Sequence, residues 1–239
     1  MNRLNIRNTL VVVGIFAVAM GLFEAVLVVY IREIFYPNGF SFPLNTGPVR
    51  LLSVELLREA ATIVMIVCVS IIAGNNRMQR FACFLYIFGV WDIFYYVGLK
   101  LILNWPESFL TWDVLFLIPV IWVGPVLAPV LCSLAMITLA GTILFFQEKG
   151  YVVMFGKTGW TLLLSGAGVV FCTFISDFGI RIIGEGLLPE VFALTRNQRF
   201  LRLLSEYVPV HFHWFFFTFG MVLIAAGTVL LILKTKKRI

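Results

Sequence analysis

Charged residues are scarce in this sequence: they make up 13% of its 239 residues, whereas a soluble domain carries roughly 25%. Apolar residues make up 61%. A soluble core of this size could not hold so many apolar side chains without exposing large apolar patches. The composition therefore excludes an ordinary soluble protein and predicts a chain whose apolar side chains face lipid.

Cysteine pairs and the common catalytic motifs are also missing. The four cysteines lie inside apolar runs without a C-x-x-C spacing, which is typical of buried apolar side chains rather than of disulfides or thiolate ligands. H-E-x-x-H, G-x-S-x-G, Walker and dinucleotide-binding motifs are absent. These absences assign no reaction class, so whether the protein is an enzyme stays open.

The net charge of +6 does not indicate a nucleic-acid partner. The basic residues lie at the two termini and in short segments between apolar runs, without a basic stripe interleaved with aromatic residues. Such placement is typical of residues that flank transmembrane helices. The expected partner is therefore the lipid bilayer.

Apolar runs of about 20 residues, the length that crosses a bilayer, predict an all-α fold: one polytopic transmembrane helix bundle over residues 1–239. The first run continues to Ile31, which is too long for a cleaved signal peptide. The predicted spans, about six in number, are 9–31, 54–73, 81–103, 124–146, 159–183 and 208–233.

Two further segments are predicted outside the spans. Pro119, Pro125 and Pro129 remove backbone donors, so 113–122 is expected to be a half-inserted or interfacial piece that leads into the fourth span. Residues 189–205 are expected to form an amphipathic helix in the outer interface, with arginines on one arc and apolar residues on the other.

The distribution of lysine and arginine predicts the orientation. Both termini are basic, and the segments between the second and third and between the fourth and fifth spans are basic too. By the positive-inside rule these segments are cytoplasmic, so both termini lie inside and the number of spans is even.

Three stretches resemble a pattern found in uncharacterised polytopic bacterial inner-membrane proteins. They lie in the second to fourth spans and are Arg58-Glu-Ala-Ala-Thr62, Trp91-Asp-Ile-Phe-Tyr-Tyr96 and Trp112-Asp-Val-Leu-Phe-Leu-Ile-Pro119 followed by Gly124-Pro-Val-Leu-Ala-Pro129. The resemblance implies a bacterial inner (plasma) membrane location and carries no assigned activity.

The ionisable residues within the spans lie between mid-membrane and the outer face. Asp92 is about 17 Å into the third span, counting 1.5 Å of rise per residue, and Glu24 lies in the outer half of the first. Because intramembrane charges face a partner, water or the bundle interior, this bias predicts a polar pocket open to the non-cytoplasmic side. Its predicted residues are Glu24, Arg58, Glu59, Trp91, Asp92, Tyr96, Asp113 and Asp177.

A simpler alternative pairs each carboxylate with a cation farther out on its own helix. Asp92 and Lys100 lie two turns apart, and Asp177 and Arg181 lie one turn apart. Such spacing favours local ion pairs whose cations extend toward the head groups. The sequence leaves both interpretations open.

His211 and His213 are the candidate metal ligands. A His-x-His pair suits one metal ion if the backbone is extended, but on a helix the two side chains point about 200° apart. A bis-histidine haem normally takes ligands from facing helices, and both histidines lie in one span, which argues against that cofactor.

Three hypotheses follow. The first is a small-molecule or ion transporter or binder that uses the outer polar pocket. The second is a membrane-embedded metalloprotein or redox subunit that uses Glu24, Glu59, Asp92 and His213. The third is a structural or assembly subunit of a membrane complex; the small residues of 165–168 permit close helix packing within or between chains.

Overall fold

Six helices of the computed structural model, which describes residues 6–45, 49–187 and 198–237, are long and apolar enough to cross a membrane. This confirms the prediction of an all-α polytopic bundle. The helices are α1 (Ile6–Phe35), α2 (Val49–Ala73), α3 (Arg77–Leu103), α4 (Leu127–Glu148), α5 (Lys157–Gly184) and α7 (Trp214–Lys234).

Most spans extend a few residues beyond the apolar runs, because polar flanking residues continue the helical hydrogen bonds. Asn76 begins α3 by accepting a hydrogen bond from the backbone nitrogen of Gln79 at 3.0 Å. The last span was predicted too early, at 208, whereas α7 begins at Trp214. Pro209 has no backbone donor, and the segment before α7 is not helical.

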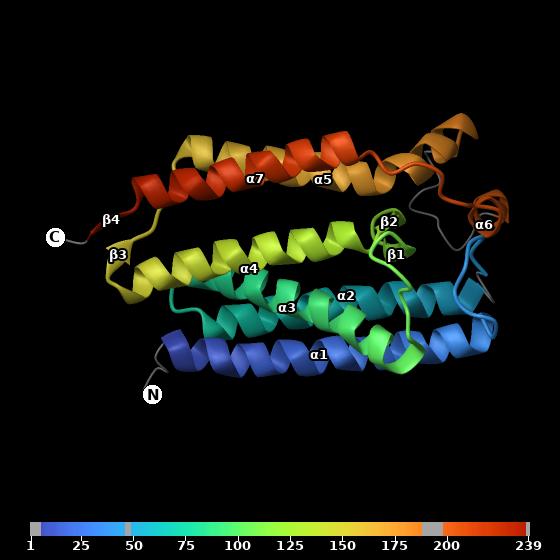
Figure 1. The fold of residues 1–239 in the computed structure, drawn as a ribbon, viewed down its shortest axis with the longest axis horizontal. Helices are drawn as coiled ribbons and strands as arrows, with labels where there is room; N and C mark the ends of the chain where they lie inside the picture. Colours follow the sequence, from blue (N-terminus) through green and yellow to red (C-terminus); the bar gives the residue numbers. More distant parts are fainter. Residues whose placement is uncertain (1–5, 46–48, 188–197, 238–239) are drawn as a thin grey trace.

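The helices form two groups that lie side by side. In the first, α3 packs against α1, α2 and α4; in the second, α5 packs mainly against α7 (Figure 1). Both termini lie at one end of the bundle, as an even number of spans requires, and this end is called the terminal end below. Two short strands, β3 (Tyr151–Val152) and β4 (Lys236–Lys237), pair there.

Glycines let α1 approach α3 closely. A Cβ atom on Gly21 would lie 2.5 Å from the backbone oxygen of Trp91, and one on Gly98 would lie 2.6 Å from the Cβ atom of Ala25. Both distances are shorter than van der Waals contact, so only glycine fits. This packing places Glu24 of α1 and Trp91 of α3 in neighbouring turns.

Replacing Gly21 by alanine is expected to lower the free energy of unfolding by about 1–3 kcal/mol, because the added methyl group overpacks a backbone contact. Gly141→Ala is the matched control: no atom lies within 4 Å of its Cβ position, so better helix propensity should raise stability by up to about 1 kcal/mol. Reversible unfolding in mixed micelles measures both, and equal effects would contradict the packing argument.

A β-hairpin occupies the region predicted as a half-inserted piece. β1 (Trp112–Phe116) pairs antiparallel with β2 (Trp122–Pro125), with Asp113 opposite Gly124. The prolines thus correctly predicted a non-helical break before the fourth span, whereas the pairing of its two strands was not predicted. Backbone groups at this depth need partners because lipid offers none, and a hairpin supplies them across its two strands.

The helix α6 (Gln198–Ser205) lies at the end opposite the termini (Figure 1). Phe200 and Leu204 are buried against Phe178 and Tyr207, so its apolar side faces the protein rather than lipid. The predicted helix over 189–205 is thus described only in its last part, since residues 188–197 lie outside the described ranges. The end with the hairpin and α6 is called the hairpin end.

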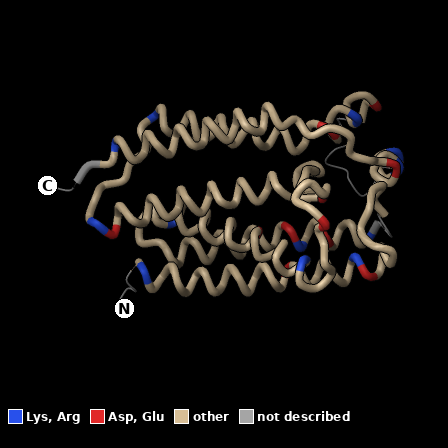
Figure 2. The backbone as a smooth tube through the Cα atoms, viewed as in Figure 1, with Lys and Arg blue, Asp and Glu red and all other residues tan. Residues whose placement is uncertain are grey.

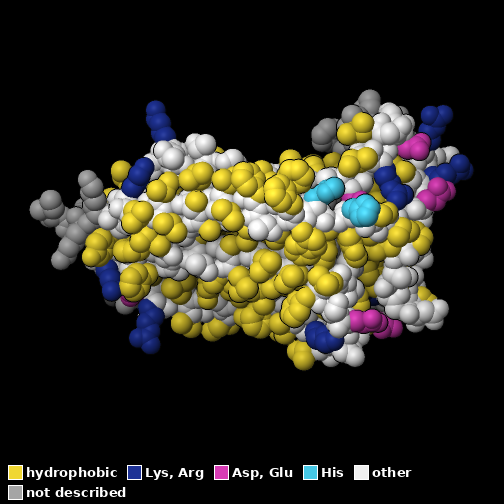
Figure 3. Space-filling view, turned by 45° about the horizontal axis from the view of Figure 1, so that its top comes forward, with side chains coloured by type: hydrophobic (Ala, Val, Ile, Leu, Met, Phe, Trp, Pro, Cys, Tyr) yellow, Lys and Arg dark blue, Asp and Glu magenta, His cyan; other side chains and the backbone are white. Residues whose placement is uncertain are grey.

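Charged residues concentrate at the two ends of the bundle and leave the middle of the helices apolar (Figures 2 and 3). Large apolar side chains are exposed along this middle zone, among them Val64 at 59% and Val222 at 58%. Such an apolar surface is stable only in lipid. The protein is a multi-pass integral membrane protein in contact with the bilayer.

Candidate functional site

A polar pocket lies inside the bundle toward the hairpin end, between α1, α2, α3 and the β-hairpin. The cavity measures about 220 Å³. Its lining contains seven of the eight residues predicted for the site: Glu24, Arg58, Glu59, Trp91, Asp92, Tyr96 and Asp113. Asp177 is not among the lining residues.

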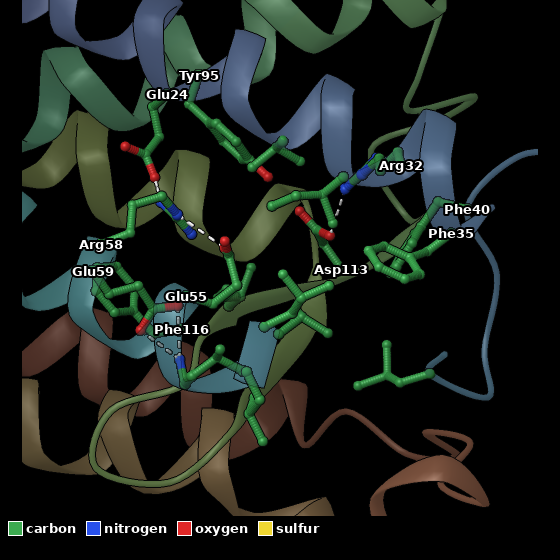
Figure 4. A pocket seen from close by; sticks show the side chains of 18 of the residues that line it. Glu24, Arg32, Phe35, Phe40, Glu55, Arg58, Glu59, Tyr95, Asp113 and Phe116 are labelled. Carbon is green, nitrogen blue, oxygen red and sulfur yellow. Dashed lines mark hydrogen bonds and ion pairs between the residues drawn. The ribbon is translucent and has the colours of Figure 1, made fainter. Parts of the chain in front are cut away.

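Arg58 of α2 connects two carboxylates in this pocket (Figure 4). Its guanidinium forms an ion pair with Glu24 of α1, and its Nε atom donates to Glu55 at 2.9 Å. The Thr62 hydroxyl, one turn farther along α2, donates to the second oxygen of Glu24 at 3.3 Å. Since Glu24 is only 5% exposed, these contacts hold α1 and α2 together around a buried charge.

Arg32 connects α1 with the hairpin. It forms an ion pair with Asp113 at 2.9 Å, and the other oxygen of Asp113 accepts a hydrogen bond from the Tyr96 hydroxyl at 3.3 Å. The guanidinium carbon lies 3.7 Å from the ring centre of Trp105 and 4.4 Å from that of Phe40. The Arg32 and Asp113 side chains are 7% and 2% exposed, so the pair is withdrawn from solvent.

Glu59 and Asp92 are held by hydrogen bonds, and Glu59 is also attracted by the charge of Arg58, the preceding residue. Both oxygens of Glu59 lie near the backbone nitrogen of Leu117, at 3.1 and 2.9 Å, and accept from it. Asp92 accepts a hydrogen bond from the Ser133 hydroxyl of α4 at 2.7 Å. Within the described ranges, neither carboxylate forms an ion pair.

The pocket therefore carries an excess of acidic groups. Five carboxyl groups and two guanidinium groups line it. Glu24 and Glu55 share Arg58, and Asp113 holds Arg32, so the unbalanced charge belongs chiefly to Glu59 and Asp92. An uncompensated buried carboxylate costs several kcal/mol, which makes this excess the most informative feature of the site.

Two hydrogen-bond donors in the pocket wall have no acceptor among the described residues: Nη1 of Arg32 and Nε1 of Trp91. Arg32 is 6% exposed and Trp91 is 5% exposed. Buried donors in native proteins almost always have a partner, which includes water and ligands. Both donors belong to side chains that line the cavity, so its contents are expected to include hydrogen-bond acceptors.

The local ion pairs considered from the sequence do not form. Lys100 donates to the backbone oxygens of Asn104 and Pro106, at 3.2 and 2.9 Å, instead of reaching Asp92. Arg181 donates to the backbone oxygen of Val208 at 3.1 Å rather than to Asp177. Glu24 and Asp113 instead form ion pairs with arginines of other elements, Arg58 and Arg32. The buried carboxylates point into the bundle, whereas Lys100 and Arg181 extend toward its end.

Asp177 belongs to a second polar cluster near the start of α7. It accepts a hydrogen bond from the Tyr207 hydroxyl at 2.6 Å and from the backbone nitrogens of His211 and Val210, at 3.3 and 3.4 Å. Burial and the hydrogen bond to Asp177 raise the pKa of Tyr207, so its phenol stays protonated as a donor. Asp177 thus positions the segment that precedes α7.

His211 and His213 lie in this non-helical segment rather than in the first turn of the last span, as had been predicted. Both histidines are exposed (Figure 3). Among the described residues, no group of three or more His, Cys, Asp or Glu side chains is placed to hold a metal ion. Their role as metal ligands stays a prediction without geometric support.

Four residues of the site were not predicted from the sequence: Arg32, Glu55, Thr62 and Ser133. Helical spacing could have indicated Glu55 and Thr62, which lie one turn on either side of Arg58 and Glu59. No sequence signal joins Arg32 to Asp113, which are 81 positions apart. Comparisons with protein-family models, with curated proteins and with solved structures found no match.

Proposed function

We propose that the protein binds a small cation or a cationic small molecule in the polar pocket, as a transporter or a binding protein. The observation that carries the proposal is the excess of carboxyl groups over guanidinium groups in the lining of the pocket. Glu59 and Asp92, the two without an ion pair among the described residues, are the residues expected to contact the positive charge.

The size and lining of the pocket support a small ligand. Its volume of about 220 Å³ is below the roughly 300–1,000 Å³ typical of pockets for drug-sized ligands. Trp91 and Tyr95 line it as well, and Tyr95 extends into the space between Arg58 and Asp113 (Figure 4). Aromatic rings attract cations, so the aromatic and acidic groups favour the same ligand charge.

The position of the pocket supports access from the hairpin end. Tyr36, Phe40 and Asn45, which follow α1, contribute to its lining together with Leu51 at the start of α2. The terminal end carries the basic segments that the positive-inside rule places in the cytoplasm. In a bacterial inner membrane, the ligand would therefore enter from the non-cytoplasmic side.

Thermal unfolding of the protein in lipid nanodiscs, titrated with chloride salts of sodium, potassium, magnesium, tetramethylammonium and choline, tests the proposal. At least one cation is expected to stabilise the protein, by about 2.7 kcal/mol at a concentration one hundred times its Kd. Asp92→Asn and Glu59→Gln should each weaken binding tenfold or more, because each removes a charge that faces the ligand.

Asp177→Asn is the matched control, because it removes a carboxylate near the same end but outside the pocket. It should leave the affinity for the cation unchanged. If no cation stabilises the protein, or if all three variants bind alike, the pocket is not a cation site.

A further inference from the structure

A second cavity, called the apolar groove below, lies between α3, α4 and α5 and measures about 470 Å³. Apolar side chains from these three helices make up most of its lining. Its polar members are few: Asp92 and Ser133, which are hydrogen-bonded to each other, and Trp122, whose Nε1 atom has no acceptor among the described residues.

The groove follows the helix axes. Phe81, Leu85, Phe88 and Asp92 lie on one face of α3 and line it, which gives it a length of about 16 Å at 1.5 Å per residue. Toward the terminal end, the rings of Phe81 and Trp160 are 5.5 Å apart. At the other end, Trp122 of the hairpin lies 4.9 Å from Phe171. Aromatic contacts thus lie at both ends of the groove.

The groove reaches the lipid-facing surface along its side. Leu164 of α5 lines it and is 65% exposed, and the neighbouring lining residue Ala167 is also exposed. Both residues lie in the apolar middle of a membrane-spanning helix. A hydrocarbon chain in the bilayer therefore has lateral access to the groove.

The groove and the polar pocket are adjacent. Asp92, Leu115 and Phe116 line both cavities, so one carboxylate and two hairpin side chains lie where the two cavities meet. Asp92 is one of the two pocket carboxylates without an ion pair among the described residues. The unbalanced negative charge is thus located where the polar cavity meets the apolar one.

We infer that the two cavities form one site for a cationic amphiphile, a lipid-like molecule with an ammonium head group and a single hydrocarbon chain. The head group occupies the polar pocket beside Glu59 and Asp92, and the chain extends along the groove toward the terminal end. The inference deepens the proposed function and rests on it, since it requires that the pocket take a cation.

The lining and the charge favour a hydrocarbon chain with a cationic end. The groove is narrow and apolar along about 16 Å of α3, and the carboxylate of Asp92 at its junction with the polar pocket supplies the complement to an ammonium group.

The test compares the binding of tetramethylammonium and hexyl- and octyltrimethylammonium to the protein in nanodiscs, with empty nanodiscs measuring partition into lipid. After that correction, affinity is expected to rise with chain length, by up to roughly fourfold per methylene group. Octyl glucoside, which has the same chain and no charge, should bind at least tenfold more weakly than octyltrimethylammonium.

Ala167→Phe fills the groove and should abolish the dependence on chain length while tetramethylammonium still binds. Leu164→Trp, at an exposed position of the same groove, repeats the test if Ala167→Phe does not fold. Gly168→Phe is the matched control, because Gly168 does not line the groove and no atom lies within 4 Å of its Cβ position. It should keep the full dependence on chain length.

Each failure has its own meaning. If tetramethylammonium binds but chain length has no effect, or if the groove variants keep the effect, the inference is overturned and the proposed function stands. If octyl glucoside binds as tightly as its cationic counterpart, the groove is an unselective lipid contact and the inference is overturned. If none of the ammonium compounds binds, the pocket does not take an organic cation, and the inference is overturned because it requires one.

Discussion

Replacing Arg58 by methionine is expected to lower the free energy of unfolding by about 3–5 kcal/mol, the cost of breaking a buried ion pair from one side. The guanidinium serves both Glu24 and Glu55, and Glu24 is only 5% exposed. Without Arg58, Thr62 is the remaining partner of Glu24 among the residues that the structure describes. Reversible unfolding in mixed micelles, followed by tryptophan fluorescence, measures the loss.

Removing the charge of Glu24, which Arg58→Met leaves without its ion pair, should restore part of the lost stability. Glu24→Gln in the Arg58→Met background is expected to be more stable than Arg58→Met alone, because a neutral amide costs less to bury than a carboxylate. Arg50→Met, in the first turn of the same helix and exposed, is the matched control and should change stability by at most about 0.5 kcal/mol. A small effect of Arg58→Met would show that water reaches Glu24.

Replacing Arg32 by leucine is expected to have a similar effect, again about 3–5 kcal/mol, for a different structural reason. Asp113 is 1% exposed, and its pair with Arg32 joins the hairpin to α1. The variant also loses the contacts of the guanidinium with Trp105 and Phe40. Reversible unfolding in mixed micelles, followed by tryptophan fluorescence, measures the loss of stability.

A double-mutant cycle separates the charge from the ring contacts. Asp113→Asn keeps a group that can accept from Tyr96 while it removes the charge, so Arg32→Leu combined with Asp113→Asn should be more stable than Arg32→Leu alone. Glu33→Gln, at the neighbouring exposed position, is the control and is expected to be nearly neutral. Additive effects of the two substitutions would contradict a direct pairing of Arg32 with Asp113.

Much of the architecture could be predicted from the sequence, because lipid imposes simple rules on it. A span needs about 20 apolar residues, and an ionisable side chain within a span must face the interior. These rules predicted six helices and predicted that Glu24, Glu59 and Asp92 lie toward the same end of the bundle. The structure brings these three side chains into one pocket.

The same rules could not predict the hairpin. The prolines near residues 119–129 indicated a break in helical structure, but a break is compatible with many backbone paths. Strand pairing between β1 and β2 became favourable only because neighbouring elements cover the hairpin: Val123 is 1% exposed and Ile121 is also buried. Burial of this kind depends on distant parts of the chain, so local sequence does not reveal it.

The sequence by itself determined that the chain lies in a membrane, the number of its spans and the end of the bundle toward which the ionisable residues within the spans lie, because each follows from the composition of contiguous runs. The tertiary structure alone decided which charges meet. Arg32 reaches Asp113 across 81 positions, and Glu59 accepts from Leu117 across 58. Such pairings depend on how helices pack against the hairpin. That packing leaves Glu59 and Asp92 without an ion pair among the described residues and places Asp92 at the junction of the two cavities.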